Sequence, residues 1–187
     1  MIQWIRDGLQ FIQTASDSEA MAEAAAEAHG VVFVPAFTGL GAPYWDPHAR
    51  GGILGLTRDT GPKEICAAAI ESVCFQTLDL LKAMAADGAD ISKLKVDGGM
   101  IHNQWMLQRL SDLSQLPVIK PKVAESTALG VAYLVGLQHG VFEDFKTIAS
   151  LWQKDKDFTS QHDKAWSDER YAQWGRGIKA VQQAHGS

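Results

Sequence analysis

Cysteine is scarce in this sequence, which contains only Cys66 and Cys74 among its 187 residues. The two lie eight positions apart on a stretch with helical spacing, a separation too long for a disulfide. The six histidines are scattered without ligand spacing, and nothing beside the cysteines completes a set of metal ligands. We therefore expect no metal site, and two reduced, buried thiols in a cytoplasmic protein.

Long apolar runs, basic clusters and common catalytic motifs are also missing. No stretch approaches the length of a membrane span, and no signal-peptide pattern opens the chain. The net charge is −5, and lysine and arginine form no run longer than a pair, whereas nucleic-acid binding needs a basic surface. No Ser-His-Asp grouping or HExxH motif occurs, so hydrolytic and zinc chemistry have no support. We expect one domain, or most of one, with no membrane span and no nucleic-acid partner.

The middle of the chain alternates strand-like and helix-like segments. β-Branched and apolar runs predict strands at 31–37, 53–57, 94–97 and 117–121. Helical spacing predicts helices at 62–87, 104–114 and 125–138, and a helical tail from about residue 145. Strands that alternate with helices indicate an α/β layer with crossover connections.

The beginning of the chain has helical spacing without a start signal. Ile2, Ile5, Leu9 and Ile12 recur at three and four residues, which predicts a helix from the first residue. Because no N-cap precedes it, we expect the sequence to begin inside a larger domain. An alanine-rich second helix at 21–30 is expected to close at Gly30.

The segment KVDGGMIHNQWMLQRLSDL places Gly98 and Gly99 between a predicted strand and a predicted helix. Such a pair lets the backbone turn sharply and lets a ligand approach it, and the helix N-terminus that follows favours an anion. Asn103 can offer its amide to the edge of an adenine, or it can cap the helix. Asp97 can bind Mg²⁺ or a phosphate-bound water, or it can cap the turn. From spacing alone, nucleotide binding and a capped tight turn both stay open.

Two other segments carry structural predictions. The helix at 125–138 contains small residues that would let it lie close to a sheet or to another helix, namely Ala128, Gly130, Ala132 and Gly136. In the Gly/Pro-rich loop at 38–52, Asp46 and Arg50 are four residues apart, which favours an ion pair that holds the loop.

Together these segments resemble the FGGY family of carbohydrate kinases. The runs VPAFTGLGAPYWDPHARGGILGLTRDT, AAAIESVCFQTLDLL, VDGG and ESTALGVAYLVGL follow the family's order and spacing, over roughly residues 1–175. The form AFTGLGAPYWDP is typical of members that phosphorylate glycerol, whereas xylulose and related sugar kinases usually carry a variant such as GERTP. The resemblance implies a ribonuclease H-like α/β domain of the actin-like ATPase superfamily. It also implies that residues 1–187 are a partial C-terminal domain, incomplete at its N-terminus.

The resemblance further implies transfer of the γ-phosphoryl of MgATP to glycerol, giving glycerol 3-phosphate, with a carboxylate base and Mg²⁺. The family's nucleotide contacts match Gly99 and Asn103, and a third matches Gln3 in IQWIRD. The family's base, polyol pocket and phosphate-binding loop match nothing in this sequence, so no catalytic residue and no metal ligand are assigned. Because phosphoryl transfer depends on positioning, residues 1–187 alone are expected to be inactive.

Two alternatives remain. The chain can belong to a sister FGGY kinase that acts on another polyol or sugar. It can also be a non-catalytic module that self-associates, because an incomplete sheet exposes an edge and apolar surface that invite pairing. We expect the chain to form a homo-oligomer.

Overall fold

A computed structural model describes residues 1–25, 30–124 and 126–185 of the chain. The elements, in chain order, are α1 (Ile2–Asp7), α2 (Asp17–Glu23), β1 (Val32–Val34), β2 (Gly52–Leu54), α3 (Pro62–Ala86), β3 (Leu94–Lys95), the 3₁₀ turn η1 (Gly99–His102), α4 (Gln104–Ser114), β4 (Val118–Pro121), α5 (Ser126–Gln138), α6 (Phe145–Ser150), β5 (Lys154–Phe158) and α7 (Lys164–His185). Within the described ranges, no helix is both long and apolar enough to cross a membrane.

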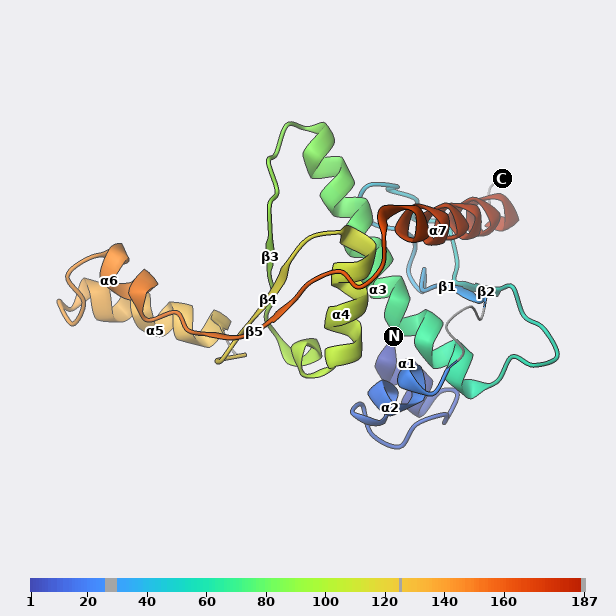
Figure 1. The fold of residues 1–187 in the computed structure, drawn as a ribbon, viewed down its shortest axis with the longest axis horizontal. Coiled ribbons are helices and arrows are strands. Elements are labelled where there is room, and N and C mark those ends of the chain that lie inside the picture. The colour runs from blue at the N-terminus through green and yellow to red at the C-terminus, as the bar shows by residue number, and fades with distance from the viewer. Residues whose placement is uncertain (26–29, 125, 186–187) are drawn as a thin grey trace.

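Helix α3 forms the centre of the body, where it packs against α2, α4 and β1 (Figure 1). It begins at Pro62, whose fixed φ suits a first helical position, and the Glu64 carboxylate accepts a hydrogen bond of 2.8 Å from the Gly61 N–H. These local start signals explain why the sequence predicts this helix correctly.

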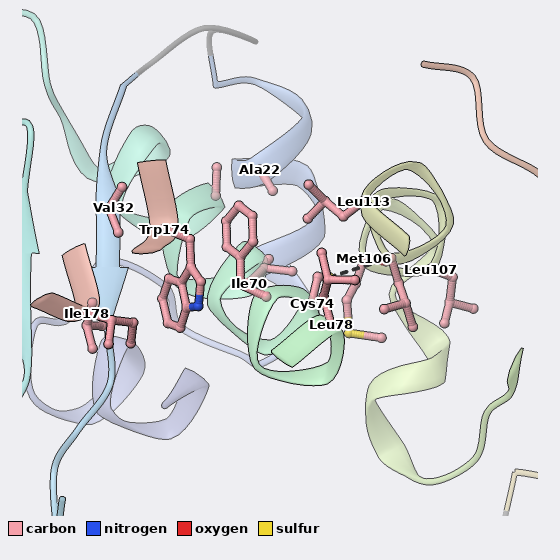
Figure 2. Packing of buried hydrophobic residues seen from close by; sticks show 14 of the residues in the cluster. Ala22, Val32, Ile70, Cys74, Leu78, Met106, Leu107, Leu113, Trp174 and Ile178 are labelled. Atoms are coloured by element: carbon pink, nitrogen blue, oxygen red, sulfur yellow. Dashed lines mark hydrogen bonds between the residues drawn. The ribbon is translucent and has the colours of Figure 1, made fainter. Parts of the chain in front are cut away.

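The main core lies between α3, α4 and α7. Trp174 of α7 is fully buried and stacks on Phe75 of α3, with ring centroids 5.3 Å apart and an angle of 10° between the planes. Figure 2 shows Trp174 on one side of α3 and Met106 of α4 on the other. The Cys74 thiol lies between these layers and donates to the Met106 carbonyl at 3.6 Å.

Both cysteines are free and buried, as the sequence predicts. Burial raises the pKa of the Cys66 thiol to about 11, and burial also raises the pKa of Cys74. Neither thiol is therefore in the reactive thiolate form near neutral pH.

Two small sheets flank the helices. Strands β1 and β2 pair antiparallel, with Phe33 opposite Ile53. In the second sheet the order is β3-β4-β5, where β3 and β4 are parallel and α4 supplies the crossover between them. The predicted α/β alternation with crossover connections is therefore confirmed.

The third strand of this sheet was not predicted. Strand β5 lies inside the tail that was expected to be helical, and it pairs antiparallel with β4 through Phe158 opposite Val118. Its sequence, KDKDF, is a poor strand former by composition, and its pairing depends on a partner 33 or more positions away in the chain. The tail therefore contains a strand between α6 and α7.

The beginning of the chain also departs from the sequence pattern. The first helix ends at Asp7, and Gln10 adopts a left-handed φ of 58°, so the helix does not continue to Ile12. Ile12 is still buried with Ile5 in one cluster, so the apolar spacing indicated burial correctly but not a continuous helix. The second helix runs over Asp17–Glu23, and residues 26–29 of the predicted helix lie outside the described residues.

Helix α5 lies away from the body, beyond the ends of β4 and β5 (Figure 1). The predicted close packing is wrong for most of it, because Val131, Leu134 and Val135 are 60%, 57% and 53% exposed. Gly136 alone among the predicted small residues is buried. A Cβ there would lie 2.6 Å from the Phe142 ring, so this glycine packs against the turn that follows its own helix.

The Gly/Pro-rich loop is held by hydrogen bonds between side chains and its own backbone, and not by the predicted ion pair between Asp46 and Arg50. Asp46 Oδ1 accepts hydrogen bonds of 3.0 Å from the Ala49 and His48 N–H groups, which hold the pKa of Asp46 below its ordinary value. Arg50 donates instead to the carbonyls of Pro47 and Ala49 at 2.9 and 2.8 Å. Four-residue spacing brings side chains together on a helix, but this segment is not helical.

Candidate functional site

The Gly98-Gly99 turn lies between β3 and α4, as the sequence predicts. Gly98 adopts a φ of +84°, which only glycine enters freely, and its N–H donates to the Ala124 carbonyl at 3.0 Å. A Cβ added to Gly98 or to Gly99 would meet no protein atom within 4 Å. The backbone of the turn therefore faces open space that a ligand can enter.

Asn103 caps α4. Its Oδ1 accepts a hydrogen bond of 2.8 Å from the Met106 N–H, so the capping role considered from the sequence is confirmed. The cap uses the oxygen and leaves the amide Nδ2 as a donor. Capping and ligand binding are therefore compatible at this residue.

Glu19 of α2 also lies at the start of α4. Its Oε1 accepts hydrogen bonds from the Gln104 and Trp105 N–H groups at 2.7 and 3.3 Å. The first turn of α4 thus already holds a carboxylate, and an anionic phosphate has no place there. Glu19 could not be predicted from the sequence, because 85 positions separate it from Gln104 and no local pattern marks it.

A cavity of about 500 Å³ joins these groups. Glu19, Gly99 and Asn103 line it, together with apolar surface from Ile2 and Met100. This size and this mixture of apolar walls with a few polar groups suit a nucleoside. The structure therefore brings two of the three predicted site residues into one cavity.

Gln3, the third predicted site residue, lies beside this cavity and does not line it. It is an exposed residue of α1, next to Ile2, which does line the cavity. Its contact with a nucleotide stays a prediction.

Asp97 precedes the turn and does not line the cavity of Gly99 and Asn103. Its carboxylate accepts a hydrogen bond from the Ser126 hydroxyl, which joins the turn to the start of α5. It lines a different cavity of about 490 Å³ together with Tyr133 and Trp152. Among the residues that the structure describes, no three acidic, histidine or cysteine side chains gather to hold a metal.

A buried ionic cluster fixes α4 behind the site. Glu71 of α3 is 1% exposed and pairs with Arg170 of α7 and with Arg109 of α4, whose Nε lies 3.3 Å from Glu71 Oε1. The Arg109 guanidinium also lies over the Trp105 ring, 4.7 Å from its centroid. The helix that carries Asn103 is therefore held by charge as well as by apolar packing.

Comparison with known proteins identifies relatives of this chain. The family model described as the C-terminal domain of the FGGY family of carbohydrate kinases matches residues 1–139. A glycerol kinase of Ectopseudomonas mendocina is 55% identical over 181 residues, and glycerol kinase 1 of Pseudomonas aeruginosa is 52% identical over 180. Each alignment covers 96% of this chain but only 37% and 36% of those relatives, so the chain spans little more than a third of their length.

Solved structures show the same similarity. Plasmodium falciparum glycerol kinase with ADP superimposes with a TM-score of 0.86 at 30% identity, over 96% of this chain and 36% of that one. A ligand-bound xylulose kinase from Lactobacillus acidophilus gives a TM-score of 0.83 at 22% identity, over 99% and 38%, which shows the shared fold alone.

Proposed function

Because the chain belongs to the FGGY family of carbohydrate kinases, we propose that it forms the nucleotide-binding part of an ATP-dependent glycerol kinase. Its α/β fold is that of these kinases, in the actin-like ATPase superfamily. The proposed reaction transfers the γ-phosphoryl of MgATP to glycerol and gives glycerol 3-phosphate. The observation that carries the proposal is the cavity shared by Gly99 and Asn103 in a chain 55% identical to a glycerol kinase.

The residues of this chain bind and orient the nucleotide. Ile2 and Met100 give the cavity an apolar wall for a purine, and Asn103 Nδ2 donates to it. The open space over Gly98 and Gly99 admits the ribose and the near phosphates. When bound, Mg²⁺ neutralises phosphate charge, and it is expected to arrive with the nucleotide, because Mg²⁺ is usually held largely by phosphates and water.

Glycerol is favoured over another sugar or polyol as the acceptor. The relatives near 50% identity are glycerol kinases, whereas the xylulose and gluconate kinases share the fold at 22% and 23% identity. No base and no polyol contact is assigned to residues 1–187, so the proposal names no residue of this chain that binds the acceptor.

Titration of the 187-residue chain with MgATP, followed by calorimetry, tests the proposed site. We expect saturable binding with one site per chain, and competition by ADP. A chain that is folded by circular dichroism and binds neither nucleotide would refute the proposal.

Homo-oligomerisation and a cytoplasmic location complete the proposal. Exposed apolar residues on α5, among them Val131 and Leu134, support association between copies. Two free, buried thiols agree with a reducing compartment.

A further inference from the structure

Glu19 is the one carboxylate among the described lining residues of the proposed nucleotide cavity. It lies on α2, partly buried, next to the start of α4 where Asn103 sits. A carboxylate repels a phosphate because both are negatively charged, so this end of the cavity suits an uncharged part of the ligand. The phosphates then lie toward the open space over Gly98 and Gly99.

Glu19 and Asn103, two of the polar residues that line the cavity, present opposite hydrogen-bonding groups. Glu19 is an acceptor only, and its two oxygens offer about four acceptor sites, of which Oε1 gives two to the Gln104 and Trp105 N–H groups. Asn103 uses Oδ1 for its cap, so it presents Nδ2 as a donor. The cavity therefore offers an acceptor beside a donor.

Adenine carries the complementary pair on one edge, because its 6-amino group donates and the adjacent ring nitrogen N1 accepts. We infer that Glu19 determines base specificity: it accepts a hydrogen bond from the 6-amino group of adenine while Asn103 donates to N1. This assignment rests on the proposed ATP site and adds the residue that selects the base. The same carboxylate also holds α2 against α4, so base recognition and the position of Asn103 depend on one side chain.

The test removes the amino group from the ligand and the carboxylate from the protein. Purine riboside 5′-triphosphate lacks the 6-amino group and keeps N1. The unaltered chain should bind ATP about fivefold more tightly than this analogue, the usual net effect of one hydrogen bond. In Glu19→Gln the amide oxygen can still accept from the helix, but the NH₂ group cannot accept from the base, so the ratio should fall to about one.

Glu23→Gln is the matched control. Glu23 ends the same helix, is exposed and does not line the cavity, so this variant makes the same change of charge and should keep the fivefold ratio. If Glu19→Gln melts below the assay temperature, Glu19→Asp replaces it, and its shorter carboxylate should also lower the ratio.

The outcomes separate this inference from the proposed function. A ratio near one in the unaltered chain, or a ratio unchanged by substitution of Glu19, overturns the inference and leaves the ATP site intact. Binding of neither triphosphate by the unaltered, folded chain overturns the proposed nucleotide site itself, and the role of Glu19 with it.

Discussion

Two adjacent glycines at the turn meet different physical requirements. Gly98 has a φ of +84°, so any Cβ there strains the backbone. Gly99 begins η1 without a left-handed φ, and nothing in the protein lies within 4 Å of the position of its Cβ. The backbone conformation therefore requires a glycine at position 98, whereas the absence of a side chain at position 99 leaves room for a ligand.

Substitutions at the two glycines should therefore have different effects. Gly99→Val should weaken MgATP binding more than tenfold and change the free energy of unfolding by less than about 0.5 kcal/mol. Gly98→Ala should lower that free energy by about 1 kcal/mol because of its φ. Calorimetric titration beside urea denaturation measures both quantities. Unchanged ATP affinity in a well-folded Gly99→Val chain would place the nucleotide elsewhere.

The two functions of Asn103 can be separated by a pair of substitutions. Asn103→Asp keeps an oxygen for the Met106 N–H but loses the Nδ2 donor, so it should weaken ATP binding while stability is retained. Asn103→Ala loses both groups, so it should weaken binding and also lower the free energy of unfolding by about 1 kcal/mol. Equal ATP affinity in the Asp variant and the unaltered chain would show that the residue is only a cap.

Among the helices and strands, the features that the sequence predicted correctly are those that local signals determine. Pro62 and Asn103 start α3 and α4 at the expected places, and the turn between β3 and α4 follows from its glycines. The surroundings of α5, the pairing of β5 and the position of Glu19 depend on contacts between distant segments, so composition and spacing did not show them. The predictable part of the candidate site, Gly99 and Asn103, is therefore the part that lies within one short segment of the sequence.

The Glu71 cluster links three elements, and its loss should be costly. Glu71→Ala leaves Arg109 and Arg170 with an uncompensated buried charge, so the free energy of unfolding should fall by about 3–5 kcal/mol. Asp168→Asn is the control, because it breaks an exposed pair with Lys164 on α7 and should cost less than about 1 kcal/mol. Urea denaturation compares them, and similar midpoints for the two variants would contradict the structural importance of the cluster.

For the whole molecule, the proposed function assigns to this chain the nucleotide side of a reaction site. Its described residues bring together groups that suit a nucleoside, and no base or polyol contact has been assigned to any of them. We expect the purified 187-residue chain to bind MgATP and to form no glycerol 3-phosphate, because positioning of both substrates supplies most of the rate in phosphoryl transfer. A coupled ADP-release assay with glycerol measures this. Turnover that co-elutes with the chain on a sizing column would contradict it.

The exposed surface of α5 should make copies of the chain associate. Val131, Leu134 and Val135 are all more than half exposed on this helix, and Figure 1 shows it extending from the body. Burial of such side chains between copies is favourable by about 25 cal/mol per Å² of apolar area. Sedimentation velocity should therefore show association that increases with concentration.

Leu134→Glu should shift this association toward monomer without lowering the melting temperature, because Leu134 is 57% exposed and contributes little to the core. Ala172→Glu adds the same charge to an exposed position of α7 and should leave association unchanged. This comparison separates a loss of apolar contact from a general effect of negative charge on a chain whose net charge is already −5. A monomer at all concentrations in the unaltered chain, or equal effects of the two substitutions, would show that α5 does not form the contact.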